Sequence, residues 1–234
     1  MGLPKPYYSE PGIEIYHGDC KEILPTLDPV DLILTDPPYG IKVHNGFKNR
    51  ANTQYGKAAA VSKDYGDFNW DNAPPHADIF KMLISMSQNQ IIFGGNFFPL
   101  PLSRCWLVWD KNNEGNDYAD CELAWTNFDK PIRKIKYTWN GMIQENMKQK
   151  EYRYHPTQKP IEVIRWCILQ APDDVKTILD PYLGSGTTLR ASKDLGKKAI
   201  GIEICEAYCE IAAKRLQQEV FNFNLSGGKE GGNV

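Results

Sequence analysis

Residues 177–195 read TILDPYLGSGTTLRASKDL, and this stretch decides the fold class. A short apolar run at 177–179 predicts a strand, and residues 187–195 have the pattern of a helix. Between them, Gly184 and Gly186 permit the tight turn and close backbone approach that a strand-to-helix ligand site needs. The unpaired N–H groups of the first helical turn favour a carboxylate or a phosphate. The stretch therefore predicts an α/β sheet with a ligand at this turn.

The turn matches neither of two common phosphate-binding motifs. Thr187 and Thr188 follow Gly186, so the GxGxxG dinucleotide pattern is absent, and no Gly-Lys-Ser/Thr marks a P-loop. However, Glu203 ends the next apolar run, where an acid is placed to bind ribose hydroxyls. The alternative is a surface carboxylate at a strand end. With the glycines upstream, we favour a nucleoside ligand.

A second motif, Asp36-Pro37-Pro38-Tyr39, follows the apolar run at 30–35. A carboxylate, two prolines and an aromatic ring at the end of a strand make a rigid corner suited to a planar base with an amino group. The alternative is a plain turn with the aspartate as a cap. Together, the two motifs predict a nucleobase at one corner and a nucleoside cofactor at the other.

Apolar runs and helical patterns alternate along the rest of the chain, which is typical of an α/β sheet. Strands are expected at 12–17, 31–35, 90–93, 105–109, 177–179 and 199–204, and a hairpin within 121–139. Helices are expected at 20–27, 76–87, 161–170, 187–195 and 206–220. We expect a single domain over residues 1–220 and a disordered Gly- and Asn-rich tail at 221–234.

The bulk composition is that of a globular protein. The chain has 234 residues, a net charge of −2 and six cysteines without a CxxC pair. No apolar run approaches the roughly 18 residues of a membrane span, and the N-terminus lacks the pattern of a signal peptide. We therefore expect a cytoplasmic protein with reduced cysteines and no metal site.

Positive charge gathers in two segments. Residues 40–63 carry five cations and no acid, and residues 130–159 carry eight cations and two acids. Basic surface on an acidic body suits a protein that grips phosphate on one side. Either segment alone is as readily a solvated loop, but both flank the motifs above. We expect DNA-contacting insertions at about 40–75 and 128–155, with contacts from Lys42, Lys48, Arg50, Lys57, Arg133, Lys134 and Lys136.

With these motifs in this order, the chain resembles the beta-type amino-methylating DNA methyltransferases, which use S-adenosylmethionine to methylate adenine N6 or cytosine N4. The matching stretches are GDC (18–20), DPPY (36–39), IIFGGN (91–96), HPTQKP (155–160), DPYLGSGTT (180–188) and GIE (201–203). The resemblance implies a Rossmann-like fold, a mostly parallel twisted sheet with helices on both faces. It also implies the circularly permuted order, in which the catalytic motif precedes the cofactor motif.

The resemblance also implies roles for single residues. The methionine part of the cofactor would be surrounded by Asp180, Gly184, Ser185 and Gly186, with Tyr182 and Thr187 in the same motif. Tyr182 stands where the family usually has Phe. The cofactor carboxylate would be held by Gln158 and Lys159, the ribose by Glu203 and the adenine amino group by Asp19.

Asp36, Pro37, Pro38 and Tyr39 are the expected catalytic residues. An exocyclic amine is a poor nucleophile because its lone pair is delocalised into the ring. The Asp36 carboxylate and the Pro37 carbonyl would accept hydrogen bonds from its two N–H groups. This would free the lone pair for direct attack on the methyl group. Tyr39 would stack on a base that has been flipped out of the duplex. No Pro-Cys dipeptide supports the cysteine route to carbon-5.

Several alternatives stay open. Adenine N6 in double-stranded DNA is the preferred target, and cytosine N4 is the first alternative. Methylation of RNA or of a protein amide is less favoured, because those enzymes usually carry the cofactor motif first. An inactive binding copy is opposed by the intact motifs. A restriction partner, a homodimer and nucleoid association are implied by resemblance alone.

Two further interpretations concern aromatic and histidine side chains. We expect His155, in a loop before a proline, to be a surface or capping residue rather than a general base. We expect core packing for most of Trp106, Trp109, Trp125 and Trp139.

Overall fold

The architecture comes from a computed structural model that describes residues 2–41, 73–114, 119–140, 143–155 and 157–218. The strands are β1 (Tyr8–Glu10), β2 (Ile13–His17), β3 (Val30–Thr35), β4 (Ser87–Phe93), β5 (Trp106–Asp110), β6 (Cys121–Thr126), β7 (Arg133–Lys136), β8 (Trp139–Asn140), β9 (Ile143–Gln144), β10 (Thr177–Asp180) and β11 (Lys198–Glu203). The helices are α1 (Cys20–Ile23), α3 (Ala77–Met86), α4 (Ile161–Gln170), α5 (Thr187–Asp194) and α6 (Glu206–Gln217). Short 3-10 turns follow at Leu24–Thr26 and Gly95–Phe97.

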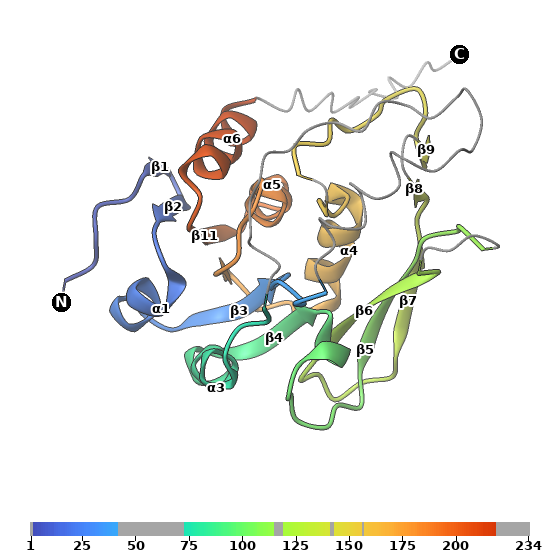
Figure 1. Ribbon diagram of the computed structural model, residues 1–234, viewed down its shortest axis with the longest axis horizontal. Helices are drawn as coiled ribbons and strands as arrows, with labels where there is room; N and C mark the ends of the chain where they lie inside the picture. Colours follow the sequence, from blue (N-terminus) through green and yellow to red (C-terminus); the bar gives the residue numbers. More distant parts are fainter. Residues whose placement is uncertain (1, 42–72, 115–118, 141–142, 156, 219–234) are drawn as a thin grey trace, which may run out of the picture.

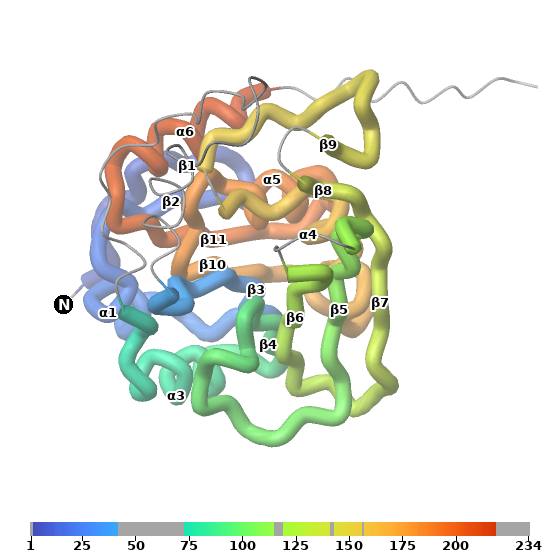
Figure 2. The backbone as a smooth tube through the Cα atoms, turned by 45° about the vertical axis from the view of Figure 1, so that its right-hand side comes forward, coloured from blue at the N-terminus to red at the C-terminus, as the bar shows by residue number. Residues whose placement is uncertain are grey.

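One large sheet organises these elements. Its nine strands, among the described residues, lie in the order β1-β2-β11-β10-β3-β4-β6-β5-β7, and β8 and β9 form a separate pair. The strands from β2 to β4 in this order are all parallel, whereas β1 and β6 run antiparallel to their neighbours. Figure 2 shows the C-terminal strands β10 and β11 lying between the N-terminal strands β2 and β3. The predicted Rossmann-like, mostly parallel sheet is confirmed.

Helices cover both faces of the sheet (Figure 1). The core on one face is built with α4, α5 and α6, through residues such as Val163, Leu189 and Ala212. The core on the other face is built with α1 and α3, through residues such as Ile23 and Leu83. The central strands β3 and β10 are therefore buried from both sides, which is why their sequences are almost continuously apolar rather than alternating.

The expected strands and helices are present within a few residues of their predicted bounds, and three short strands, β1, β8 and β9, were not anticipated. The expected hairpin in 121–139 is wrong. Strand β5 lies between β6 and β7, pairing antiparallel with β6 and parallel with β7. Residue pattern reveals that a strand exists but not which neighbour it joins, and here the chain crosses to the far side of β5.

Some predictions fall outside the described residues. These are the contacts expected from Lys42, Lys48, Arg50 and Lys57, most of the 40–75 insertion, and the tail at 221–234.

Candidate active site

The two sequence motifs meet at one edge of the sheet. Asp36 follows β3, Asp180 ends β10, Glu203 ends β11 and Asp19 follows β2, and these strands are parallel. Their carboxyl ends therefore share an edge, which is where open α/β sheets bind ligands. A cavity of about 500 Å³ opens there and is lined by both motifs. Thr35 and Asp180, 145 residues apart, are joined across it by a 2.8 Å hydrogen bond from the Thr35 hydroxyl.

Asp36 is held by two donors. Its Oδ1 accepts the Tyr39 hydroxyl at 2.5 Å, and its Oδ2 accepts the Lys159 ammonium at 2.5 Å. The carboxylate is mostly buried, and this burial raises its pKa above the ordinary value, although the Lys159 charge opposes the shift. Its orientation is thus fixed before any substrate arrives, as electrostatic preorganisation requires.

Tyr39 is packed as tightly as Asp36. Its ring stacks on Phe97 with centroids 5.0 Å apart and planes 15° from parallel. Gly94, at a φ of +65°, lies under the ring, and a Cβ there would sit 2.2 Å from a Tyr39 ring carbon. Only glycine therefore fits, which gives the Gly-Gly-Asn stretch after β4 a physical role: it makes room for Tyr39.

Lys159 lies at the centre of a buried charge network. Its Nζ is 2.5 Å from Asp36 Oδ2 and 3.0 Å from Glu122 Oε2, and Glu122 Oε1 is 2.6 Å from Lys111 Nζ. Burial disfavours the charged lysine, but Asp36 and Glu122 outweigh it and raise the pKa of Lys159. Burial likewise works against ionised Glu122, and the two lysines reverse the effect and lower its pKa. Lys159 and Glu122 therefore stabilise each other's charged forms.

Asp180 is the buried carboxylate of the second motif. Its Oδ1 accepts the Thr35 hydroxyl and, at 3.1 Å, the Tyr182 N–H. Burial raises the pKa of Asp180 to about 6, and its hydrogen bonds limit the rise.

Glu203 fixes the glycine turn. It accepts the Gly184 N–H at 2.7 Å through Oε2 and the Cys205 N–H at 2.8 Å through Oε1. Each carboxylate oxygen has a second lone pair, so both retain capacity for ligand hydroxyls. Gly186, at a φ of +84°, lies against α6, where a Cβ would come within 2.7 Å of Ala212 Cβ.

Gln158 and Ser185 link the loop before α4 to the glycine turn. Gln158 Oε1 accepts the Ser185 hydroxyl at 3.1 Å and the Tyr154 N–H at 3.0 Å. Behind them, Arg215 of α6 donates from Nη1 to the Ser185 carbonyl at 2.6 Å and to its hydroxyl at 3.0 Å. The glycine turn is thus held from the cavity side and from α6.

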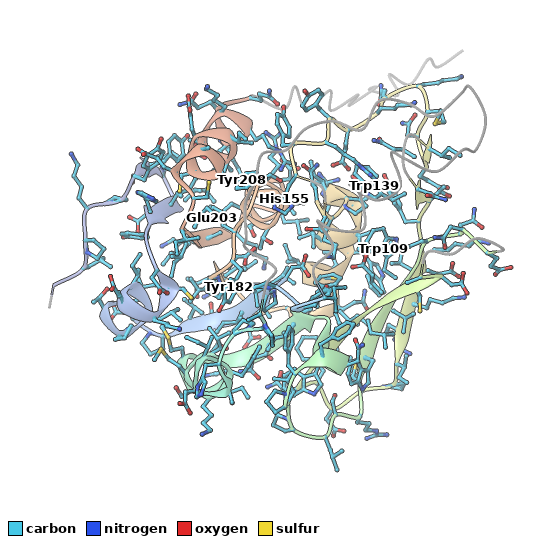
Figure 3. The ribbon with its side chains drawn as sticks, viewed as in Figure 1. Trp109, Trp139, His155, Tyr182, Glu203 and Tyr208 are labelled. Atoms are coloured by element: carbon cyan, nitrogen blue, oxygen red, sulfur yellow. The ribbon has the colours of Figure 1, made fainter. Side chains whose placement is uncertain are left out.

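His155 lines the cavity and is partly exposed. Its ring packs against Tyr208 with centroids 4.7 Å apart, and burial lowers its pKa to about 4. The expected capping role is confirmed, because Nδ1 accepts the Thr157 N–H at 3.3 Å. In Figure 3, His155, Tyr208 and Glu203 lie near α5 and α6, away from Trp109.

The structure brings most of the sequence-derived site residues together. The cavity is lined by Asp19, Asp36, Pro38, Gln158, Lys159, Asp180, Tyr182, Gly184, Ser185, Thr187 and Glu203. Pro37, Tyr39 and Gly186 are not among the lining residues. Trp109, Trp125 and Trp139 are buried in the core, as expected. Sequence reasoning missed Glu122, Tyr208 and Arg215. For Glu122 a signal existed, namely an acid inside an apolar strand.

The expected DNA contacts on β7 are exposed but lie at different ends of the strand. The register aligns Lys136 with Asp110 and Cys121, beyond the carboxyl end of β4, and aligns Arg133 with Leu107 nearer the opposite edge. Lys136 is therefore at the cavity edge of the sheet and Arg133 is away from it. Lys134 Nζ is 3.1 Å from Asp110 Oδ2.

Neither a metal cluster nor a membrane span is found in the part of the chain that the structure describes. No three His, Cys, Asp or Glu side chains there are grouped to hold a metal ion. Among the same residues, no helix is both long and apolar enough to cross a membrane.

A doubly covered parallel sheet with a nucleoside-type turn at β10 and an Asp-Pro-Pro-Tyr corner at β3 defines the class of Rossmann-like methyltransferases. Comparison with known proteins agrees. The sequence model of the N6_N4_Mtase family, described as DNA methylase, matches residues 102–214. The match spans just under half of the chain, and it confirms the predicted resemblance to the amino-methylating DNA methyltransferases.

Three relatives illustrate the match. The Type II methyltransferase M2.LlaDCHI of Lactococcus lactis subsp. cremoris is 27% identical, covering 92% of this chain and 93% of its own. The DNA adenine methyltransferase YhdJ of Escherichia coli (strain K12) is 41% identical over 66 residues, 28% of this chain and 22% of its own. The crystal structure of M1.HpyAVI in complex with SAM has a TM-score of 0.53 and 24% identity, covering 87% of this chain and 99% of its own.

Proposed function

We propose that this protein transfers the methyl group of S-adenosylmethionine to the exocyclic N6 of adenine in double-stranded DNA, by direct attack from a flipped-out base. The observation that carries the proposal is the Asp36 carboxylate, oriented by Tyr39 and Lys159 in a cavity that is also lined by the glycine turn. The match to the DNA methylase family model supports the reaction class, and the similarity to the DNA adenine methyltransferase YhdJ supports the target base.

The cavity fits S-adenosylmethionine in size and charge. Its volume of about 500 Å³ lies in the range of small-molecule sites. Among the described residues, four acids, Asp19, Asp36, Asp180 and Glu203, line it together with one lysine, Lys159, which favours a ligand with positive charge. When bound, the cofactor supplies an electrophilic methyl group on a sulfonium.

Each chain segment has a role in holding that ligand. We propose that Glu203 accepts the ribose hydroxyls, Asp19 accepts the adenine amino group, and Asp180 with the 184–187 turn surrounds the methionine part. Gln158 and Lys159 were expected to hold the carboxylate. In this geometry the Lys159 ammonium lies between Asp36 and Glu122, which supports a role at the catalytic corner instead.

At the catalytic corner, Asp36 accepts one N–H of the target amine and the Pro37 carbonyl accepts the other. The two bonds draw the nitrogen out of conjugation, so its lone pair becomes available. Because Asp36 is already oriented and mostly desolvated, it does not need to reorganise when charge develops on the nitrogen. Pro38 and Tyr39 shape the wall against which the flipped base rests.

Methylation in cells tests the proposal directly. Expression in a methylation-free host, followed by modification-sensitive sequencing, is expected to show N6-methyladenine within a defined sequence motif. N4-methylcytosine would move the target to cytosine. No modified motif, together with no tritium transfer from labelled cofactor to DNA in vitro, would contradict a DNA-modifying activity.

A variant at Asp36 tests the assignment of the two corners. Asp36→Asn keeps the size of the side chain but removes the charge, and we expect methyl transfer to fall by about 100-fold or more. Cofactor affinity, measured by calorimetry, is expected to change little, and Asp36→Ala to behave alike. An equal loss of cofactor binding would show that the two corners are not separate.

The proposed partners are DNA and a second subunit, and the proposed location is the bacterial cytoplasm. We propose that the 40–75 and 128–155 segments contact DNA phosphates, that the protein works in the bacterial cytoplasm at the nucleoid, and that a second subunit completes target recognition. Sedimentation with and without a DNA duplex tests the last point.

A further inference from the structure

The buried charge network around Lys159 includes residues that lie outside the sequence motifs. Four side chains form a row along the cavity edge of the sheet: Lys111 after β5, Glu122 on β6, Lys159 before α4 and Asp36 after β3. Two of them, Lys111 and Glu122, belong to no motif of the proposed reaction. All four are mostly buried, with exposed side-chain fractions between 7% and 25%.

The Lys159 ammonium is shared between two carboxylates. It lies 2.5 Å from Asp36 and 3.0 Å from Glu122, over the Phe93 ring at 5.1 Å. The row of two acids and two lysines is electrically balanced, and a buried charge is tolerated only when it is paired. Removing one member therefore alters the charge that the others experience.

The sharing has a consequence for Asp36. If the ammonium were paired with Asp36 alone, it would lower the proton affinity of that carboxylate further and make it a weaker acceptor. Glu122 offsets part of the ammonium's charge through its own ion pair with Lys159. Asp36 then remains oriented by Lys159 while keeping a higher proton affinity for the incoming N–H.

We propose that Glu122 is a positioning residue for the methyl-transfer reaction, which shares Lys159 with Asp36 and so sets the strength and orientation of Asp36 as acceptor for the target amine. The inference rests on the proposed function. Lys111 balances Glu122 from the outer side of the row.

The test is the pH profile of methyl transfer by the full-length protein. Asp36 is faced by Tyr39 from its own loop, Lys159 from the start of α4, Glu122 from β6 and Asp180 from β10. Glu122 raises the pKa of Asp36, so Glu122→Gln is expected to move the acid limb of kcat to lower pH. We expect kcat at pH 8 to fall about tenfold, equivalent to about 1.4 kcal/mol.

Two comparisons separate positioning from general structural damage. Lys111→Gln leaves the charge of Glu122 less balanced and is expected to move the acid limb to higher pH, opposite to Glu122→Gln. Glu210→Gln, at an exposed acid paired with Lys214 on α6, is expected to behave as wild type. Cofactor affinity is expected to stay within about twofold in all three, because the row contacts the catalytic corner.

The outcomes are distinct. A Glu122→Gln protein with wild-type kcat and pH profile would overturn the inference, as would acid limbs that move in the same direction in both variants. If Glu122→Gln does not fold, the direction of the shift in Lys111→Gln decides. A wild-type protein that transfers no methyl group to DNA overturns the proposed function itself, whereas an active wild type with an unaffected Glu122→Gln overturns this inference alone.

Discussion

At the scale of single residues, burial gives two site groups unusual proton affinities. Asp180 has its pKa raised to about 6, mainly because it is buried and partly because Asp36 is near. The pKa of His155 is lowered to about 4, again by burial, so its imidazole is neutral across the physiological range. A proton equilibrium near pH 6 in this cavity therefore belongs to a carboxyl group.

This shift predicts how ligand binding depends on pH. A cationic cofactor favours ionised Asp180, so its affinity is expected to rise about tenfold between pH 5 and pH 7, with proton release on binding below pH 7. The stability of the ligand-free protein changes with pH in the opposite direction. Its folded state holds the proton more tightly than the unfolded chain, so its free energy of unfolding falls as the pH rises from about 4 to about 6.

Calorimetry in buffers of different ionisation enthalpy measures both the affinity and the proton release. Asp180→Asn, which cannot titrate, is the matched control and should flatten the dependence. An equally steep pH dependence in that variant would assign the proton to another group.

At the scale of elements, the direction of β7 separates residues that sequence treats alike. Arg133 and Lys136 are both exposed cations on one short strand. Because β7 runs parallel to β5, its carboxyl end carries Lys136 to the cavity edge, while Arg133 begins the strand nearer the other edge.

If DNA lies over the cavity edge of the sheet, Lys136 and Arg133 contribute differently to the salt dependence of DNA binding. Lys136→Ala is expected to reduce the slope of log K against log salt concentration by about 0.9, the value of one phosphate contact, while Arg133→Ala leaves it unchanged. Titrations of a DNA duplex at several salt concentrations measure both slopes. Equal effects of the two substitutions would place DNA along the whole strand.

The same salt titration tests the basic segment at residues 40–63. Neutralising Lys48, Arg50 and Lys57 together is expected to weaken DNA binding and flatten the salt dependence, and an unchanged slope would remove the segment from the interface.

At the scale of the whole molecule, the cavity draws on elements from both halves of the chain. Its walls come from α1, β3, β4, α4, β10, α5, β11 and α6 and from the loops after β2 and before α4. A ligand that fills it therefore bridges segments that pack around one sheet, and binding should oppose unfolding of the entire domain.

Linkage sets the size of this effect. At a free cofactor concentration 100 times its dissociation constant, the free energy of unfolding is expected to rise by about 2.7 kcal/mol. For a chain of this size that raises Tm by about 5–10 °C. Thermal unfolding with increasing cofactor measures the shift, and Glu203→Ala should shrink it at equal concentration. No shift in the wild type would show that the cavity does not bind this ligand.

Sequence alone determined the central elements of the fold. Strands such as β3 and β10 are continuously apolar and the helix α4 begins after a proline, so local pattern fixed their type and nearly their bounds. Asp36 and Glu203 were found because a polar residue directly after a buried run lies at the functional edge of a parallel sheet.

Only the tertiary structure decided which strands are neighbours and which charges meet. The place of β5 between β6 and β7, the packing of His155 against Tyr208 and the sharing of Lys159 between Asp36 and Glu122 all depend on contacts between distant segments. Local pattern reports whether a residue is buried, but partner choice is set by the packing of the whole sheet. Glu122 was therefore recognisable in the sequence as an acid within a mostly apolar strand, but only the fold places it beside Lys159.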